Sequence, residues 1–455
     1  MVSLTLFGGV GQIGGNKILV EDGDTRVFFD FGEPFRFLDK YFVDFLKPRD
    51  GRFGLRDYFH FDLLAKTPGL YDEEWLTDTD LPYCQPEFDA MFISHMHFDH
   101  ANHLKFADRK IPVYLGAAAN AIRQSWEKTS LGNTYFGEHE FREFRTGMKV
   151  KVGSLEVVPV HVDHSTPGAY GFVIHTSEGA IVYTGDLRLH GPRSDMTLEF
   201  VERAAEAKPV AMLCEGTRVC PDDPRKNLSE QAVGEEALRL VKGTGKIAIV
   251  SFYPKDVDRM RTFRDIARAT GRKFVVSAKV AHLMQALCGD DRIDVPDPLN
   301  DPSMLVYVRK MVKPERVPYE NDYLKLKKDG KSDHVVDSDF VRKNQRGLIF
   351  HCDFFQLAEL IDVAPERGSL FLRSKSEPFE EDDIQEDVLQ NWISSFGLDF
   401  QQAHASGHAS MEEIFQIVDR VSPRAVIPVH TEHPDMFTKC SCEVRLAEPR
   451  KRMDV

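Results

Sequence analysis

The stretch "FISHMHFDHANH", residues 92–103, places four histidines and one aspartate within twelve positions. His95, His97, Asp99 and His100 form the motif H-x-H-x-D-H within it. Side chains two residues apart on an extended segment point to the same side, so His95 and His97 can face one point. Asp99 and His100 follow at a turn and can face a second point. Imidazole together with carboxylate suits zinc, and manganese less commonly, so the stretch predicts a metal site.

Three further residues of ligand type follow strand-like runs of sequence. His164 comes after "EVVPVHVD", Asp186 after "AIVYTG", and His430 after "AVIPV". Open sheets gather their sites where strands end. Each residue alone is a weak signal, since an aspartate at a strand end is more often part of a turn. Together, and in this order, they predict that distant segments complete the site begun by the first motif.

Length and composition indicate a globular chain with more than one core. The chain has 455 residues, 42% of them hydrophobic and 29% charged. No apolar run reaches the length of a membrane span, and the N-terminus lacks the pattern of a secretory signal. The seven cysteines are scattered without a CxxC pair, which favours a reducing cytoplasm. A net charge of −14 argues against coating nucleic acid through the global field, although a local basic groove remains open.

The glycines near the N-terminus imitate a nucleotide-binding motif. Gly9, Gly11 and Gly14 have the spacing GxGxxG directly after a strand-like run. A dinucleotide site needs a helix next, so that the helix N-terminus meets the pyrophosphate. The sequence that follows, "NKILVEDGDTRVFFDFG", is typical of two strands joined by a turn. We therefore expect a glycine-rich turn between strands.

The pattern changes after Thr217. Helix-like and strand-like segments then alternate, as in "LSEQAVGEEALRLVKGTG", "KIAIVSF", "KDVDRMRTFRDIARATGR" and "KFVVSA". This alternation predicts a doubly wound α/β unit that runs to about residue 390. Within it, Arg259 either approaches a phosphate or makes an ion pair between helices. The basic clusters at 325–331 and 342–346 either line a channel for a nucleic-acid strand or form a solvated face.

The motif order resembles that of a known superfamily. H-x-H-x-D-H followed by single His, Asp and His residues at strand ends resembles the metallo-β-lactamase superfamily. "CEGT" with Glu215, an α/β insert, "SGHAS" with His408 and "PVHTE" with His430 resemble its β-CASP branch. With "GGVGQIGGN", they are most similar to the ribonuclease J family. The resemblance implies an α/β fold, with a metallo-β-lactamase αββα sandwich in residues 1–217 and 391–455 and an inserted β-CASP domain in residues 218–390.

The resemblance also implies a role for each site residue. One zinc would be held by His95, His97 and His164, and a second by Asp99, His100 and His430, with Asp186 bridging both. His408 and Ser406 would contact the scissile phosphate, and Glu215 would orient His408, so that Asp99, Asp186, Glu215 and His408 are the expected catalytic residues. Asp30 would support the metal loop from behind, where a turn-forming aspartate is the alternative. Two metals about 3.5–4 Å apart can share a water, and the bridging hydroxide would attack phosphorus.

The chain departs from the ribonuclease J pattern in three places. Thr431 stands where glycine is usual after the last ligand, and "SFYPKDVDRM" replaces a more polar stretch in the insert. Only 25 residues follow His430. The C-terminal dimerisation domain of ribonuclease J is therefore expected to be absent, and the oligomeric state stays open.

The expected function is a metal-dependent nuclease that hydrolyses single-stranded RNA in processing or decay. An external hydroxide does not need the 2′-hydroxyl, so DNA is not excluded, and the choice between endonuclease and 5′-exonuclease stays open. One alternative is a hydrolase of the same fold acting on a small ester, lactone or cyclic phosphodiester. Another is an RNA-binding or assembly protein with an inactive site. The insert favours the nuclease because it would roof the metals and form a groove, and the complete ligand set disfavours an inactive site.

Overall fold

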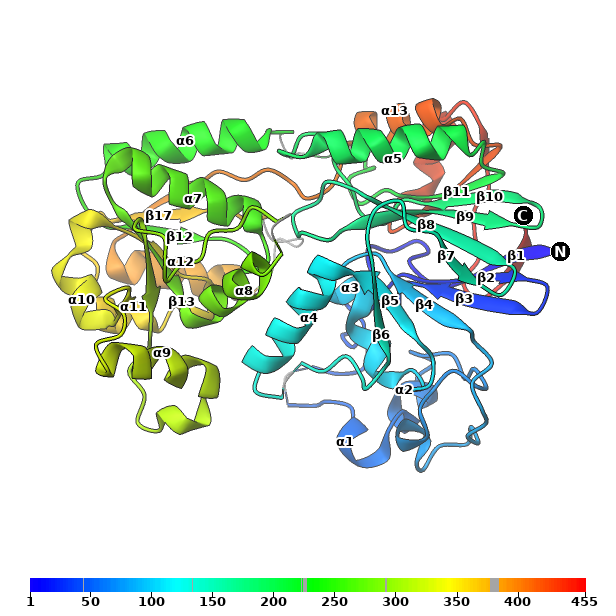
Figure 1. Ribbon diagram of the computed structural model, residues 1–455, viewed down its shortest axis with the longest axis horizontal. Helices are drawn as coiled ribbons and strands as arrows, with labels where there is room; N and C mark the ends of the chain where they lie inside the picture. Colours follow the sequence, from blue (N-terminus) through cyan, green and yellow to red (C-terminus); the bar gives the residue numbers. More distant parts are fainter. Residues whose placement is uncertain (44, 133, 222, 224–226, 291–292, 377–383) are drawn as a thin grey trace.

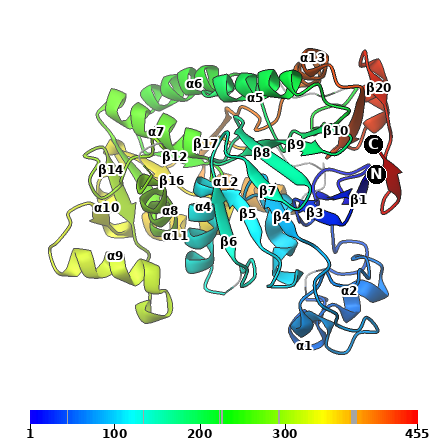
Figure 2. The same cartoon turned by 45° about the vertical axis from the view of Figure 1, so that its right-hand side comes forward.

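The computed structural model describes residues 1–455 except 44, 133, 222, 224–226, 291–292 and 377–383 (Figure 1). Within the described residues the strands form three sheets of seven strands each. Two of these sheets pack face to face as a sandwich, and the third lies in a separate lobe (Figures 1 and 2). Among the described residues, no helix combines the length and the apolar character that crossing a lipid bilayer requires.

The sandwich contains the following strands. The first sheet has the order β21-β1-β2-β3-β4-β5-β6, with β1 (Val2–Gly8), β2 (Lys17–Asp22), β3 (Thr25–Phe29), β4 (Ala90–Ile93), β5 (Val113–Gly116), β6 (Phe141–Phe144) and β21 (Arg452–Asp454). The second has the order β20-β19-β11-β10-β9-β8-β7, with β7 (Val150–Val152), β8 (Leu155–His161), β9 (Tyr170–Thr176), β10 (Gly179–Tyr183), β11 (Ala211–Glu215), β19 (Ala425–Val429) and β20 (Glu443–Val444).

Aromatic and aliphatic side chains fill the space between these two sheets. The Phe29 ring lies 5.4 Å from that of Phe92 on its own sheet and 5.3 Å from that of Phe172 on the facing sheet, measured between centroids. Helices cover the outer faces, as Figure 1 shows. They are α1 (Asp50–Phe53), α2 (Arg56–His60), α3 (Phe98–Ala101) and α4 (Ala117–Thr129) beside the first sheet, and α5 (Ser194–Glu206) and α13 (Met411–Val421) over the second. The expected αββα sandwich is confirmed.

The third sheet belongs to the insert, and every strand pair in it is parallel. Its order is β15-β14-β13-β16-β12-β17-β18, with β12 (Ala248–Ser251), β13 (Lys273–Ser277), β14 (Met304–Tyr307), β15 (Val335–Val336), β16 (Leu348–His351), β17 (Leu370–Arg373) and β18 (Asp399–Gln402). Its helices are α6 (Glu230–Gly243), α7 (Val257–Thr270), α8 (Ala278–Cys288), α9 (Pro318–Lys328), α10 (Ser338–Lys343), α11 (Glu359–Val363) and α12 (Ile384–Phe396). The predicted alternation of helices and strands is confirmed.

The domain limits at residues 217 and 390 stay a proposal, and β18 bears on the second of them. Because β18 pairs with β17 in the third sheet, we propose that the insert ends after Gln402 and not at residue 390. The chain then returns to the sandwich through the segment 403–410 and α13.

The glycine-rich stretch is a turn between antiparallel strands, as expected. β1 and β2 pair antiparallel on either side of it, and Gly9, Gly11 and Gly14 all have positive φ. The turn supports the metal loop. The backbone N–H groups of Gly15 and Asn16 both donate to the carbonyl oxygen of Asp99, at 2.9 and 3.2 Å.

Parallel pairing brings the predicted site residues to one edge of the sandwich. β10, β11 and β19 are neighbouring parallel strands, so their carboxyl ends lie together. Asp186 follows β10, Glu215 ends β11, and His430 follows β19. His164 follows β8, and the H-x-H-x-D-H loop follows β4 of the facing sheet. The site therefore lies where strand ends of both sheets meet.

Candidate metal centre

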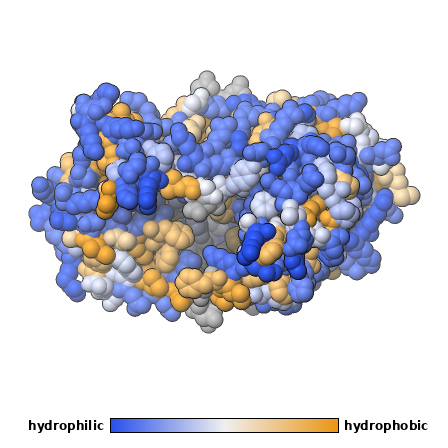
Figure 3. Space-filling view, turned by 90° about the horizontal axis from the view of Figure 1, so that it is seen from below, coloured by the Kyte–Doolittle hydropathy of each residue, from blue (hydrophilic) through white to orange (hydrophobic). Residues whose placement is uncertain are grey.

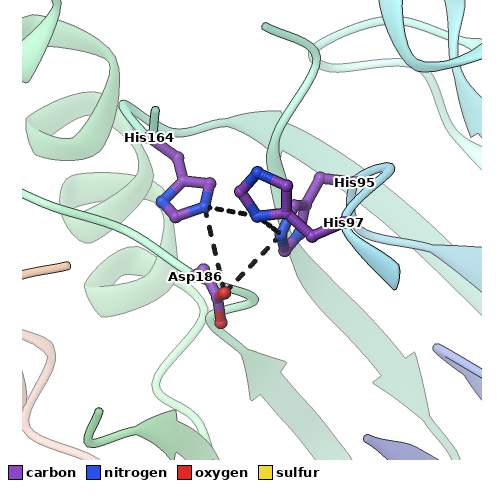
Figure 4. Close-up of side chains that lie close together, drawn as sticks. All are labelled: His95, His97, His164 and Asp186. Atoms are coloured by element: carbon purple, nitrogen blue, oxygen red, sulfur yellow. Dashed lines mark hydrogen bonds and ion pairs between the residues drawn. The ribbon is translucent and has the colours of Figure 1, made fainter. Parts of the chain in front are cut away.

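The first ligand group consists of His95, His97, His164 and Asp186, whose ligand atoms all lie within 4.8 Å of one another (Figure 4). Nδ1 of His97 lies 3.0 Å from Nε2 of His95 and 3.1 Å from Nε2 of His164. Oδ2 of Asp186 lies 3.5 Å from Nε2 of His95 and 3.9 Å from Nε2 of His164. Three ring nitrogens and one carboxylate oxygen thus converge on one point, which is the donor set of a four-coordinate zinc site.

The second group consists of Asp99, His100, Asp186 and His430, all buried. Nε2 of His430 lies 3.0 Å from Oδ2 of Asp99, although 331 positions separate the two residues. Nε2 of His100 lies 3.1 Å from Oδ2 of Asp186 and 3.6 Å from Oδ2 of Asp99. Asp186 belongs to both groups, which is the position that the resemblance implies for it.

The donor set fits a pair of divalent cations. Within the described part of the chain, neither carboxylate oxygen of Asp186 has a hydrogen-bond partner, although both are buried. A buried carboxylate in this state is costly unless a cation compensates it. The shared position of Asp186 between the two groups places its two oxygens where two cations could be bound. The predicted metal site is therefore present in the structure as a candidate cluster, and the identity of the metal belongs to the proposal below.

Burial keeps the histidines of the first group neutral, which is the form that binds metal. Desolvation lowers the pKa of His97 to about 3 and the pKa values of His95 and His164 well below the usual range. In the second group burial also opposes charge on His100 and His430, but the neighbouring carboxylates, above all Asp186 and Asp99, together outweigh it and raise both pKa values. The second group therefore has a strongly negative potential that favours a bound cation.

Asp30 supports the metal loop from behind. It is fully buried, and its carboxylate accepts hydrogen bonds from the Ser94 N–H at 2.7 Å, the Ser94 hydroxyl at 2.8 Å and the Tyr183 hydroxyl at 2.5 Å. Oδ2 also lies 2.8 Å from Nδ1 of His100, which leaves Nε2 of that ring for a metal. Asp30 has a positive φ of 59°, and its side chain makes the supporting contacts that the resemblance implies.

Glu215 precedes the insert in the sequence and His408 follows it, and the two side chains are in contact in the structure. Nδ1 of His408 lies 3.1 and 3.2 Å from the two carboxylate oxygens of Glu215, as the resemblance implies. Glu215 is fully buried and also accepts hydrogen bonds from the Leu187 N–H at 2.8 Å and the Thr217 hydroxyl at 2.7 Å. Ser406 lies beside His408, and its hydroxyl accepts the His408 N–H at 3.1 Å. Whether these side chains contact a substrate is part of the proposal below.

Two supporting residues escaped the sequence analysis. Thr217 lies 2.8 Å from Nδ1 of His430 through its hydroxyl, and so it connects Glu215 to the second ligand group. Lys255 donates from Nζ to the carbonyl oxygen of Met96, between two ligands, at 2.7 Å, and its ammonium lies over the rings of Phe98 and Trp126. Thr217 lies in the "CEGT" motif, and its position two residues after Glu215 in that motif is a sequence signal for a supporting role. Lys255 lies in the stretch that departs from the family pattern, where no local feature marks it.

Of the two alternatives for Arg259, the structure shows the ion pair between helices. It is fully buried and binds Glu230 of α6, so it is not exposed to a substrate. Of the two basic clusters, 325–331 carries ion pairs at its surface, such as Lys327 with Asp337 and Lys331 with Asp329. These pairs favour the solvated face over a binding channel.

Comparison with known proteins agrees with this fold and site. Residues 77–252 match the family described as "Beta-lactamase superfamily domain", and residues 398–438 match the "Zn-dependent metallo-hydrolase RNA specificity domain". A solved structure described as a protein of unknown function from Enterococcus faecalis V583 is similar with a TM-score of 0.77, at 24% identity and with full coverage of both chains. That likeness shows the fold.

Curated relatives carry the name ribonuclease J. The chain is 23% identical to "Ribonuclease J" of Sinorhizobium meliloti, 23% to "Ribonuclease J 1" of Streptococcus pyogenes and 25% to "Ribonuclease J" of Mycolicibacterium smegmatis. These alignments cover 75%, 95% and 94% of this chain but only 57%, 69% and 68% of the respective relatives.

The fold is a sandwich with an inserted α/β domain and two ligand groups at its edge, and residues 77–252 and 398–438 match domains of the metallo-β-lactamase superfamily. Within that class the chain resembles ribonuclease J over most of its length, as its motifs predict.

Proposed function

We propose that the protein is a metal-dependent ribonuclease that hydrolyses phosphodiester bonds in single-stranded RNA. The observation that carries the proposal is the pair of buried ligand groups that share Asp186 and have His408 beside them. We further propose zinc as the metal in both positions, because histidine and carboxylate ligands suit zinc, with manganese as the less common alternative. The activity is a proposal because the chain spans little more than half of the first relative named above.

In the proposed site, His95, His97 and His164 would hold one cation, Asp99, His100 and His430 would hold the other, and Asp186 would be a ligand to both. Two divalent cations would supply a water of lowered pKa as the nucleophile and would offset the negative charge of the phosphodiester. The protein itself first fixes the orientation of the histidine rings that would bind the cations. Asp30 fixes the His100 ring, and the carbonyl of Gly407 accepts from His164 Nδ1 at 2.6 Å, so each ring presents Nε2 to the centre.

His408 is the proposed contact to the scissile phosphate. With Nδ1 bound to the Glu215 carboxylate, Nε2 is the ring nitrogen left for a substrate. Through Nε2 the ring can donate to a phosphate oxygen or give a proton to the departing 3′ oxygen. Ser406 would bind the same phosphate through its hydroxyl hydrogen, because its oxygen already accepts from the His408 N–H.

Two observations support RNA over a small ester as the substrate. The match to an RNA specificity domain covers residues 398–438 and therefore includes Ser406, His408 and His430. The surface is also hollowed between the insert and the sandwich when it is seen from below (Figure 3). A strand needs such an open approach, which a small ester does not require. Cleavage of DNA, the choice between endonuclease and 5′-exonuclease action, and the cytoplasmic location stay predictions.

The test uses RNA and DNA oligonucleotides of one sequence, labelled at the 5′ or the 3′ end, with protein stripped by EDTA and reloaded with zinc or manganese. Cleavage of RNA by reloaded protein is expected, with mononucleotides from one end for an exonuclease and internal fragments for an endonuclease. His408→Ala should retain its metals and lose about 10²-fold or more in rate. His175→Ala, at an exposed histidine of β9, is the matched control and should keep full activity. A parent protein that cleaves no oligonucleotide with either metal would refute the proposal.

A further inference from the structure

A buried arginine joins the insert to the sandwich directly behind the metal centre. Arg188 is 0% exposed, and its guanidinium contacts three carboxylates. Nε lies 3.1 Å from Asp163, Nη1 lies 2.7 Å from Glu230, and Nη2 lies 2.6 Å from Asp258. Each of the three nitrogens therefore has its own carboxylate partner. The planar guanidinium fixes the direction of every one of these bonds.

The partners of Arg188 come from both lobes. Asp163 directly precedes the ligand His164, and Arg188 itself lies two residues after Asp186, so both belong to the loops of the metal centre. Glu230 is the first residue of α6, and Asp258 lies in the first turn of α7. The carboxylates at these two helix N-termini are stabilised by the helix dipoles. One guanidinium thus connects two loops of the sandwich to the beginnings of two helices of the insert.

The ion pairs of Arg188 extend to two further arginines. Arg259 shares Glu230 with Arg188, and Nη2 of Arg261 lies 2.5 Å from the other oxygen of Asp258. The cluster, which we call the arginine joint, consists of Arg188, Arg259, Arg261, Asp163, Glu230 and Asp258. Its three carboxylates offset the cost of burying the guanidinium groups of Arg188 and Arg259.

The arginine joint also holds the segment that presents His408. Arg188 Nη1 donates to the carbonyl oxygen of Ser406 at 3.2 Å, and Arg259 Nη2 donates to that of Ala405 at 3.4 Å. The Ser406 hydroxyl in turn accepts the N–H of His408. The same guanidiniums that seat α6 and α7 therefore fix the peptides next to the proposed phosphate contact.

We propose that Arg188 is a positioning residue that couples the seating of the insert to the placement of His408 over the metals. Arg188 transmits the position of α6 and α7 to the peptide of Ser406, because it contacts Glu230, Asp258 and the carbonyl oxygen of Ser406 together. This coupling rests on the proposed function only in taking His408 as the contact to the phosphate. A purely stabilising ion cluster would instead affect every part of the site equally, and this difference makes the proposal testable.

The first experiment is a double-mutant cycle with Arg188→Met and His408→Ala, measured by cleavage of a 5′-labelled single-stranded RNA oligonucleotide at saturating zinc. Arg188→Met should lower kcat by about 10²-fold in the parent, because a displacement of about 1 Å has that effect on a positioned group. In the His408→Ala background the same change should alter kcat by less than about twofold, since the residue it positions is gone. An equal loss in both backgrounds would overturn the proposal.

The second experiment measures the coupling between the insert and residues 404–410 without an assay of catalytic activity. Hydrogen exchange is measured on peptides covering residues 404–410 and the first turns of α6 and α7. Arg188→Met should speed exchange in all three, whereas Arg309→Met should leave 404–410 unchanged. Arg309 is a suitable control because it binds Glu320, a buried carboxylate within the insert, in a similar two-nitrogen pair. Unchanged exchange at 404–410 in the folded Arg188→Met protein would refute the coupling.

The two readouts separate the two proposals. If the parent cleaves no RNA but exchange at 404–410 responds to Arg188→Met, the proposed function fails and the coupling stands. If Arg188→Met does not fold, Arg188→Lys and Asp258→Asn give the same comparison with a smaller disturbance, since each keeps one part of the ion network. For each of these variants, faster exchange at residues 404–410 supports the coupling, and unchanged exchange refutes it.

Discussion

His100 and Asp186 face each other at the centre of the site, with Nε2 of the imidazole 3.1 Å from Oδ2 of the carboxylate. Because Asp186 also faces His95 at 3.5 Å, one side chain serves both ligand groups. Asp186→Ala should therefore reduce the metal content from about two ions per chain to one or none. Inductively coupled plasma mass spectrometry measures this content. Asp195→Ala, at an exposed aspartate that pairs with Arg193, should retain both ions. Two ions in Asp186→Ala would show that Asp186 is not shared.

Asp30 offers a test of support without direct ligation. Asp30→Ala removes the acceptor for Ser94, Tyr183 and His100 at once. We expect metal affinity to fall by about 10- to 100-fold and unfolding free energy to fall by about 3 kcal/mol or more. Asp30→Asn should be milder, because asparagine keeps an acceptor oxygen and tolerates the φ of 59°. Chelator competition and urea unfolding measure the two effects, and equal losses in both variants would contradict this account.

Gly32 tests how closely the chain packs behind the metal loop. A Cβ at this position would lie 1.7 Å from the carbonyl oxygen of Asp99, which is backbone and cannot give way cheaply. Gly32→Ala should therefore displace the loop and lower metal content as well as stability. Gly11→Ala is the matched control, because a Cβ there meets nothing within 4 Å. Its φ of 63° should cost only about 1–2 kcal/mol in unfolding free energy and leave the metals bound. Full metal content in Gly32→Ala would contradict the expectation.

The buried amine of Lys17 should make the unfolding free energy depend on pH. Burial lowers its pKa to about 7, and Nζ donates to the carbonyl of Gly32. Between pH 7 and the unfolded value near 10.4, the unfolded chain holds a proton that the folded chain has lost, so stability rises with pH. The unfolding free energy of the parent relative to Lys17→Met should increase by up to about 1.4 kcal/mol per pH unit from pH 7 to 9.

Urea unfolding at pH 6, 7.5 and 9 measures this difference for Lys17. Lys149→Met serves as the control, since Lys149 is 69% exposed and should give a difference that is flat over the same range. A flat difference for Lys17→Met as well would mean that the buried amine does not titrate near pH 7.

The ligand set was predictable because local patterns carry it. A spacing of two residues on a strand indicates His95 and His97, and ligand types directly after apolar runs indicate Asp186 and His430. Parallel pairing of β10, β11 and β19 then makes those strand ends neighbours. Each candidate ligand can therefore be identified from its own strand and the residues directly after that strand.

Other features depend on partners far away in the chain and leave no local pattern. β18 reads "DFQQ" and is mostly half-buried, so nothing in it indicates a strand, and the sequence therefore predicts a domain limit near residue 390 where the pairing of β18 favours a later one. Arg188 reaches Glu230, which is 42 positions away, and Ser406, which is 218 positions away. Such contacts follow from how the two lobes meet, and a single sequence does not record that geometry.

The 331 positions between Asp99 and His430 also bear on when the site can form. During synthesis, β4 and the loop after it leave the ribosome long before β19. A nascent polypeptide that stops short of His430 lacks a ligand of the second group, however well its earlier segments have folded. The second ligand group is therefore complete only after translation has passed His430.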